Sequence, residues 1–301
     1  MRWSSQTVLV TGGAGFIGQH LIRWLVKERA NIVVVDDFST GKMENIPSRC
    51  EILKCNVSNA GIFKRMPHID YVFHFGAPSS VILFNRNPKT AFRDTIIGFI
   101  NILEWAKDAG IKKIIYPSSG SVYGRNPLPH SEECNPAPNN LYGIAKLNCE
   151  HIASHYSEVV PSIGLRIFAG YGPGEDHKGE IASVITLFLD SMIRGKKPTI
   201  YGDGEQMRDF VYIDDVVKSI EKSAERSVEG VVNVGSGRAY TFNSVVSLIN
   251  EFLDKDITPT YIPKPVSYLE NTLAAIGKMK HLLGVNPMNL ETGLSKYLGN
   301  L

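Results

Sequence analysis

Tyr142 and Lys146 have the residue types and the spacing for joint acid–base chemistry. They stand four residues apart in Tyr142-Gly143-Ile144-Ala145-Lys146, and on a helix this spacing puts the phenol and the ammonium on one face. A tyrosine with an unperturbed pKa of about 10 is a poor base at neutral pH. A neighbouring positive charge lowers that pKa, so the pair could act as general acid and base. A surface pair on an amphipathic helix is the alternative.

Three serines follow an apolar run that ends at Tyr116, in the sequence Pro117-Ser118-Ser119-Gly120-Ser121. If the run is a strand of a parallel sheet, the serines lie at its carboxyl end, where such sheets build their sites. A hydroxyl there could hydrogen-bond a substrate oxygen and share a proton with Tyr142. The alternative is that these serines only form a turn.

A glycine-rich segment follows the first apolar run. Gly12, Gly15 and Gly18 form GxxGxxG between Thr7–Val10 and a helical pattern, a spacing that lets a pyrophosphate approach the N–H groups of a helix start. The next apolar run ends in Asp36, whose carboxylate could accept hydrogen bonds from an adenosine ribose. Since a carboxylate repels a 2′-phosphate, the sequence favours NAD over NADP. A ligand-free βα turn is the alternative.

The elements that would position these residues alternate between strands and helices. We expect strands at Thr7–Val10, Asn31–Val35, Ile52–Lys54, Tyr71–Phe75, Lys113–Tyr116 and Ser162–Phe168, and helices at Ile17–Arg29, Pro88–Ala109 and Leu141–Tyr156, the last capped by Asn139 or Asn140. The pattern predicts an α/β fold with a Rossmann-type, doubly wound parallel sheet. After residue 170 the chain becomes richer in glycine and proline.

We therefore predict two domains. Residues 1–170 would form the dinucleotide-binding domain, and 171–301 a smaller, interleaved α/β substrate lobe, with segments near 205–235 returning to the first domain. Two further helices are expected at Ile181–Gly195 and Asp214–Ala224.

Composition excludes several classes of function. The 32 Lys and Arg against 30 Asp and Glu leave a net charge of only +2, which argues against a nucleic-acid partner. Four cysteines without a CxxC pair suggest free thiols in a reducing compartment and predict neither disulfides nor a metal site. No apolar run is long enough to cross a bilayer, so we expect a cytoplasmic protein without a membrane partner.

Together, TGGAGFIG, Asp36, PSSGSVYG, YGIAK and RDFVYIDD make the chain resemble the nucleotide-sugar epimerase/dehydratase family, a group of extended short-chain dehydrogenases/reductases. The resemblance covers nearly the whole chain and is nearest to the UDP-glucose 4-epimerases. It implies an NAD-dependent enzyme in which Ser119, Tyr142 and Lys146 are catalytic. It also implies a homodimer that pairs the helices at Pro88–Ala109 and Leu141–Tyr156, although core packing would equally explain their apolar positions.

The remaining site residues are also what the resemblance implies. The NAD-binding residues are Gly12, Gly15, Phe16, Ile17, Asp36, Asp37, Ser39, Thr40, Gly41, Asn56, Val57, Phe75, Gly76, Ala77, Tyr142 and Lys146. The substrate-binding residues are Ser119, Ser121, Tyr142, Ile200, Tyr201 and Arg208, with Arg208 as the clamp on the sugar-nucleotide phosphates.

The chain departs from the family pattern at four positions. Asn56 stands where Asp is usual, Thr95 and Ala169 stand where Asn is usual, and Ala275 replaces an Asp. An expected Arg is also absent from Pro263–Lys278, where Lys264 is a possible substitute. Each departure removes a hydrogen bond or a charge, mostly from the substrate pocket.

The reaction that the resemblance implies is 4-epimerisation of a UDP-sugar through a 4-keto intermediate. Dehydratases of the family carry Asp and Glu directly after the catalytic residue, where this chain has Gly120 and Ser121. UDP-glucuronate epimerase or decarboxylase and a dTDP-sugar reductase or dehydratase stay open. So does a non-catalytic NAD-binding protein, because a fold alone does not establish activity.

Overall fold

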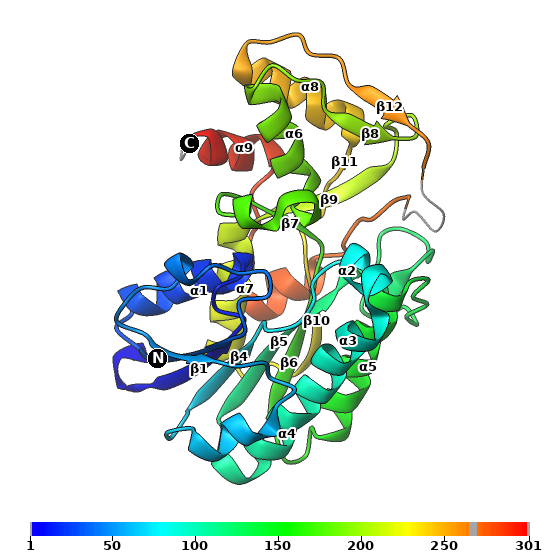
Figure 1. Cartoon of the computed structure of the whole chain (residues 1–301). Coiled ribbons are helices and arrows are strands. Elements are labelled where there is room, and N and C mark those ends of the chain that lie inside the picture. Colours follow the sequence, from blue (N-terminus) through cyan, green and yellow to red (C-terminus); the bar gives the residue numbers. More distant parts are fainter. Residues whose placement is uncertain (1, 265–269, 300–301) are drawn as a thin grey trace.

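A seven-stranded parallel sheet forms the centre of the computed structural model, which describes residues 2–264 and 270–299 (Figure 1). The strand order is β10-β6-β5-β4-β1-β2-β3, and every neighbouring pair is parallel. The strands are β1 (Thr7–Thr11), β2 (Asn31–Asp36), β3 (Glu51–Lys54), β4 (Tyr71–His74), β5 (Lys113–Ser119), β6 (Ser162–Ile167) and β10 (Gly230–Val234). The strand order reverses between β1 and β4, which confirms the doubly wound Rossmann-type fold and marks where such sheets bind ligands.

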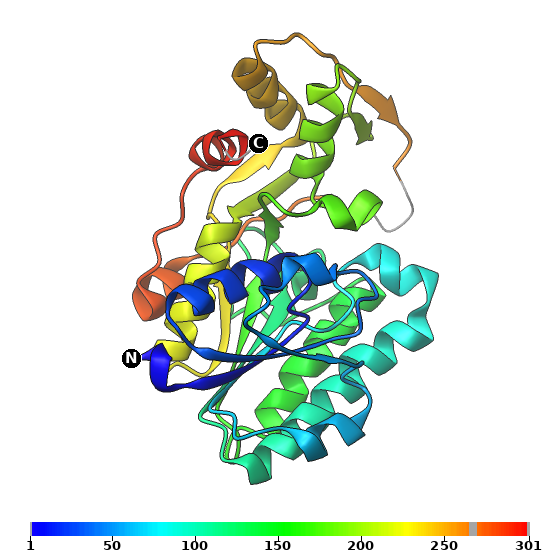
Figure 2. The same cartoon turned by 60° about the vertical axis from the view of Figure 1, so that its left-hand side comes forward.

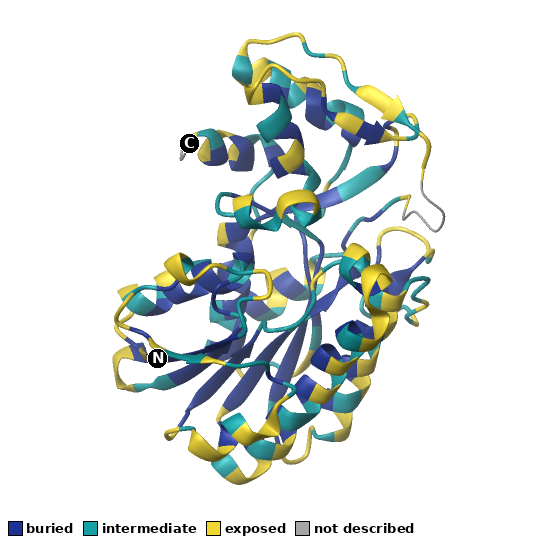
Figure 3. Ribbon diagram, viewed as in Figure 1, coloured by how far each residue is buried: buried dark blue, intermediate teal, exposed yellow. Residues whose placement is uncertain are grey.

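Helices cover both faces of the sheet, as its nearly continuous apolar strands require. Along β1, Val8 and Val10 pack in one buried cluster with Leu21 of α1 (Phe16–Lys27), together with α7 (Ile213–Glu225). Leu9 points to the opposite face and packs in a second cluster with Phe99 of α4 (Gly98–Ala109) and with α5 (Leu141–His155). Figure 3 shows the strands buried while the helices alternate between buried and exposed faces.

The helix expected at Pro88–Ala109 is helical throughout but is not a single α-helix. The structure divides it into α3 (Pro88–Phe92), a π-helical segment η4 (Arg93–Ile97) and α4. A π-helical turn inserts one extra residue per turn and is common at functional sites. The expected strands and the other expected helices are present, and their ends differ from the expected ones by at most three residues. Asn140 caps α5 by accepting from the Gly143 N–H.

The small lobe lies above the carboxyl edge of the sheet (Figure 2). We use this name for the elements between residues 169 and 298 that do not pack on the large sheet. Its strands are β7 (Ala169–Tyr171), β8 (Thr199–Tyr201), β9 (Met207–Tyr212), β11 (Ala239–Thr241) and β12 (Thr260–Ile262), and its helices are α6 (Val184–Ile193), α8 (Phe242–Leu253) and α9 (Leu290–Leu298).

Three later segments return to the large sheet. α7 packs against α1, β10 extends the sheet beside β6, and the π-helical segment η7 (Met279–Leu283) contacts both α7 and β10. α7 and β10 lie in the range near 205–235 that the sequence analysis expects to return to the first domain. η7 is a third returning segment, which the sequence analysis did not expect. A domain boundary near residue 170 stays a prediction.

The remaining helical elements are short. They are η1 (Trp3–Ser5), η2 (Met43–Asn45), η3 (Ala60–Arg65), α2 (Val81–Arg86), η5 (Gly120–Tyr123) and η6 (Asp176–Ile181). All four cysteines, Cys50, Cys55, Cys134 and Cys149, are free in the structure. Among the described residues, no helix has the length and apolar character needed to cross a membrane.

Candidate active site

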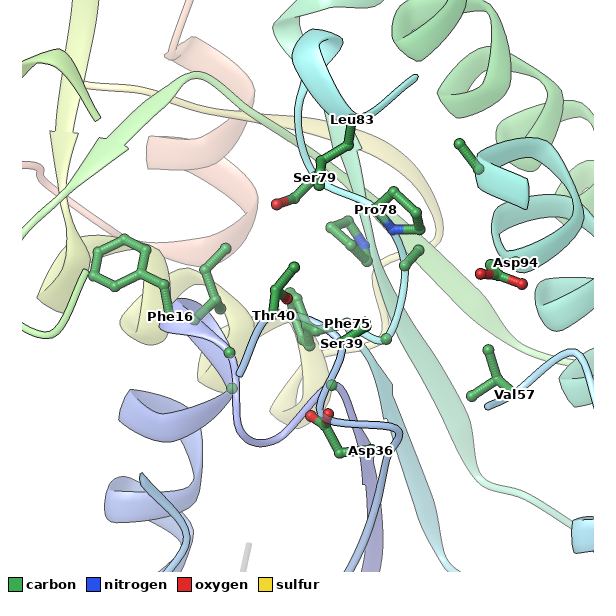
Figure 4. Close-up of a pocket in the computed structure, with 18 of the residues that line it drawn as sticks. Phe16, Asp36, Ser39, Thr40, Val57, Phe75, Pro78, Ser79, Leu83 and Asp94 are labelled. Atoms are coloured by element: carbon green, nitrogen blue, oxygen red, sulfur yellow. The ribbon is translucent and has the colours of Figure 1, made fainter. Parts of the chain in front are cut away.

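A cavity of about 500 Å³ opens at the carboxyl ends of the strands, beneath the small lobe. The predicted cofactor residues that line it are Gly12, Gly15, Phe16, Ile17, Asp36, Asp37, Ser39, Thr40, Asn56, Val57, Phe75, Gly76, Ala77, Tyr142 and Lys146. Ser119 also lines it. Figure 4 shows Phe16, Asp36, Phe75 and Val57 around this space, contributed by different segments of the chain. The structure therefore brings together residues more than 100 positions apart in the chain.

The glycine loop approaches the turn after β4 closely. Gly12 has φ +69°, and a Cβ on it would lie 2.5 Å from the carbonyl carbon of Phe75. Gly15 precedes α1, and among the described residues no side chain caps the first-turn N–H groups of that helix. Uncapped N–H groups at a helix start, with the positive end of the helix dipole, form a binding site for an anion such as a pyrophosphate.

Asp36 ends β2 and braces the same loop. Its Oδ2 accepts a hydrogen bond from the Ala14 N–H at 2.9 Å, and its Oδ1 accepts from the Phe38 N–H at 2.8 Å. Burial raises the pKa of this carboxyl, although both hydrogen bonds oppose the shift. Each carboxylate oxygen has two lone pairs, so both can accept a further hydrogen bond from a ligand hydroxyl.

The side chain of Asn56 is occupied within the protein. Its Nδ2 donates to Asp37 Oδ2 at 2.7 Å, while its Oδ1 accepts from the Ser58 N–H at 2.9 Å and from Ser58 Oγ at 2.7 Å. Burial pushes the pKa of Asp37 upward, but hydrogen bonds from Ser39 and Asn56 outweigh it and hold the pKa below its usual range. Asn56 therefore links the loops after β2 and β3.

A buried pair that the sequence analysis missed supports the turn after β4. Thr11 Oγ1 and His74 Nδ1 lie 2.7 Å apart, and the same hydroxyl accepts from the Gly76 N–H at 3.0 Å. His74 stacks on Phe99 with 5.4 Å between ring centroids, and burial lowers the pKa of its imidazole to about 3. A neutral histidine thus fixes the backbone beside the cavity.

Ser119, Tyr142 and Lys146 meet on the β5 side of the cavity. Ser119 ends β5 close to the Tyr142 phenol, while Lys146 Nζ lies 5.7 Å from the centre of the Tyr142 ring. Burial raises the pKa of Tyr142, with the Ser119 side chain opposing it, and burial lowers the pKa of Lys146. The sequence led us to expect a lowered pKa for Tyr142. In the protein without a ligand, the effect of burial is larger, and the pKa of Tyr142 is raised.

Beneath these residues lies a buried ionic network that the sequence analysis also missed. Arg166 of β6 donates from Nε to Glu150 Oε1 at 2.9 Å and from a terminal nitrogen to Oε2 at 2.6 Å. Its other terminal nitrogen donates to the Tyr123 hydroxyl at 2.9 Å. Ser118, which lines the cavity, hydrogen-bonds Glu150. The network connects α5, β5 and β6 directly under the catalytic candidates.

The small lobe contributes His177, Lys178 and Ile181 of η6 to the cavity wall. Lys178 Nζ lies 2.5 Å from the buried Glu175 carboxylate and 5.1 Å from the centre of the Phe16 ring. Gln19 of α1 donates to the Gly174 carbonyl at 2.8 Å, which ties this segment to the large sheet. A lone His-Lys pair in a loop carries no sequence signal that would have identified it.

Five predicted residues do not line this cavity. A Cβ on Gly41 would lie 2.5 Å from the Ala14 carbonyl carbon, and the Ser121 N–H donates to Ser119 Oγ at 3.1 Å. Ile200 is wholly buried in the core, and Tyr201 is 41% exposed.

Arg208 is the fifth of these residues. One of its terminal nitrogens donates to the carbonyls of Met207 and Glu270 at 2.9 and 2.8 Å, and its guanidinium lies over the Phe242 ring. Its role as a phosphate clamp stays a prediction. In the nearby range Pro263–Lys278, residues 265–269 lie outside the described residues, while Lys264 pairs with Glu270 at 2.8 Å.

Within residues 2–264 and 270–299, no group of three or more His, Cys, Asp or Glu side chains is placed to hold a metal ion.

Comparison with known proteins gives a match to a family model and several similar solved structures. Residues 8–235 match the model of the NAD dependent epimerase/dehydratase family. A solved UDP-glucose 4-epimerase with UDP-glucose from Thermotoga maritima is 34% identical, with a TM-score of 0.94 and 97% of each chain covered. A UDP-N-acetylglucosamine 4-epimerase from Methanobrevibacter ruminantium, in complex with UDP-N-acetylmuramic acid, is 31% identical, with a TM-score of 0.91 and 98% and 99% covered.

An ADP-L-glycero-D-manno-heptose-6-epimerase from Helicobacter pylori is 34% identical, with a TM-score of 0.90 and coverage of 100% of this chain and 97% of that one. All three of these proteins are named as epimerases, but their names differ in the nucleotide, in the sugar and in the carbon that is epimerised.

Proposed function

We propose that this chain, which belongs to the NAD-dependent epimerase/dehydratase family, is a nucleotide-sugar 4-epimerase that interconverts UDP-glucose and UDP-galactose. The observation that carries the proposal is the meeting of Ser119, Tyr142 and Lys146 in one cavity with the uncapped start of α1. Similarity to the Thermotoga enzyme, which was solved with UDP-glucose, supports the choice of substrate.

The residues around the cavity fit NAD. The uncapped N–H groups of α1 would bind the pyrophosphate, and Asp36 would accept hydrogen bonds from the adenosine ribose and repel a 2′-phosphate. Tyr142 and Lys146 would bind the other ribose on the β5 side. NAD, when bound, would accept a hydride from C4 of the sugar and later return it.

The chain's own residues would manage the proton. Tyr142 would take the proton of the sugar 4-hydroxyl as the C4–H bond breaks, with Ser119 hydrogen-bonded to the same oxygen. Lys146 would stabilise the phenolate through its positive charge. The 4-keto sugar would then rotate in the cavity so that its opposite face receives the hydride. Tyr142 would return the proton to form the new 4-hydroxyl. Proton and hydride are both given back, so the cofactor ends unchanged.

The dehydratase alternative lacks its acids. Gly120 is buried, and a Cβ there would lie 3.2 Å from the Phe168 ring, so even a small side chain would crowd this position. Ser121, at the second position, has no carboxyl group. Elimination of water needs an acid and a base beyond the tyrosine, which these two residues do not provide.

A substrate panel tests the proposal. The purified protein would be incubated separately with UDP-glucose, UDP-N-acetylglucosamine, UDP-glucuronate, dTDP-glucose and an ADP-heptose, and the products separated by chromatography. We expect UDP-galactose from UDP-glucose, with no net consumption of NAD. Tyr142→Phe should abolish turnover, whereas Tyr156→Phe, a matched change just beyond α5, should not. Conversion of another sugar in preference to UDP-glucose, or full activity of Tyr142→Phe, would overturn the proposal.

We also propose a homodimer that pairs the outer faces of α4 and α5. Large apolar side chains are exposed on α5, at Leu141 (36%) and Ile144 (37%), and at Ile97 (45%) of η4, directly before α4. Burying them against a second copy would remove apolar surface from water. Light scattering coupled to gel filtration should give twice the chain mass, and Ile144→Glu should give the monomer mass. A monomeric wild-type protein would contradict this.

A further inference from the structure

Asp94 is a cavity-lining carboxylate to which the sequence analysis gave no role. It belongs to the π-helical segment η4, and only 9% of the residue is exposed. Figure 4 shows Asp94 and Val57 on the same side of the cavity. Its Oδ1 accepts from Arg93 at 2.8 Å and from Ser58 Oγ at 3.4 Å. Within the described residues no hydrogen bond reaches its Oδ2, which is left for a ligand.

The position of Asp94 places it at the adenine end of a bound dinucleotide. The start of α1 would hold the pyrophosphate, with Tyr142 and Lys146 on the β5 side of it, so the adenosine half must extend to the other side, past Asp36 toward β3. The loop after β3 is the one that η4 and α4 contact. There Asn101 donates to the Val57 carbonyl at 3.1 Å.

The alternative acceptor at this end, Asn56, is already engaged. Its Nδ2 and Oδ1 bond Asp37 and Ser58, so reading a base would cost it these bonds. An ionised carboxylate only accepts hydrogen bonds. The matching edge of a purine is therefore one with a donor, such as the 6-amino group of adenine, and not one with an acceptor, such as the 6-oxygen of hypoxanthine.

We propose that Asp94 determines base specificity by accepting a hydrogen bond from the 6-amino group of adenine through Oδ2. The inference rests on the NAD site described above but not on the identity of the sugar. The π-helical turn is what makes it possible, because it turns residue 94 toward the loop after β3. A carboxylate facing a purine 6-oxygen would instead set two acceptors against each other, which disfavours binding.

Competition between two dinucleotides tests the proposal. Intact protein would be equilibrated with an equimolar excess of NAD and nicotinamide hypoxanthine dinucleotide, and the bound ratio read by native mass spectrometry. The wild-type protein should favour NAD by about tenfold or more. Asp94→Asn, whose amide can turn its NH2 toward a 6-oxygen, should reduce the ratio by about tenfold.

Arg93→Gln is the matched control, because it removes the charged partner of Oδ1 but keeps the carboxylate, and the Arg93 side chain is 56% exposed. It should leave the ratio unchanged. The proposal is overturned if Asp94→Asn binds the two dinucleotides in the wild-type ratio, or if Arg93→Gln shifts the ratio equally. A wild-type protein that binds neither dinucleotide would refute the cofactor site itself, which is a different result.

Discussion

Replacing Glu150 by alanine should destabilise the protein strongly, because it leaves Arg166 as an unpaired buried charge. The two side chains are only 4% and 6% exposed, and Glu150 accepts two of the three side-chain hydrogen bonds that the guanidinium donates. Removing one partner of a buried ion pair typically costs about 3–5 kcal/mol. That is a large share of the roughly 5–15 kcal/mol by which a domain is stable.

Urea denaturation followed by circular dichroism would measure this loss. The exposed Glu104→Ala, which breaks an ion pair with Lys107 on α4, is the control and should not change the midpoint measurably. The double variant Glu150→Leu with Arg166→Met should recover most of the lost stability, because it removes both charges and keeps the volume. A loss below about 1 kcal/mol for Glu150→Ala, or a double variant as unstable as the single one, would refute the reasoning.

Three further changes test the cofactor side of the cavity. Asp36→Ala should weaken binding of NAD more than that of NADP, because only the carboxylate discriminates against the 2′-phosphate; equal weakening in calorimetric titrations would remove the ribose assignment. Gly12→Ala should abolish dinucleotide binding, since a Cβ would lie 2.5 Å from the Phe75 backbone at φ +69°, and retention of tight binding would contradict this. The pKa of His74 is about 3 in the fold and 6.5 when unfolded, so the unfolded chain binds the extra proton. Stability should therefore fall as the pH drops from 6.5 toward 3, by up to about 1.4 kcal/mol per unit, and His74→Gln should flatten this dependence in urea titrations at several pH values.

Local spacing is what made part of the fold and site predictable. The β1–α1–β2 unit combines apolar strands, glycines and Asp36 within 30 residues, and the Tyr142–Lys146 pair lies on one helical turn. These features depend on neighbours in the chain. The doubly wound parallel sheet was predictable from them.

The rest depends on partners that are distant in the sequence. Thr11 and His74 are 63 residues apart, and η6 reaches the cavity only because the small lobe folds over the sheet. The expected continuous helix over Pro88–Ala109 missed η4, since a π-helical segment of five residues is too short to be told from the surrounding α-helical pattern. That turn is what places Asp94 on the cavity wall.

The most direct test of the 4-epimerase assignment follows a label. UDP-glucose carrying deuterium at C4 would be incubated with the protein and the product examined by nuclear magnetic resonance. Because the hydride removed from C4 is returned to C4 in the same cavity, we predict UDP-galactose that retains deuterium at C4. Deuterium at another carbon, its loss to solvent, or no UDP-galactose at all would contradict the account.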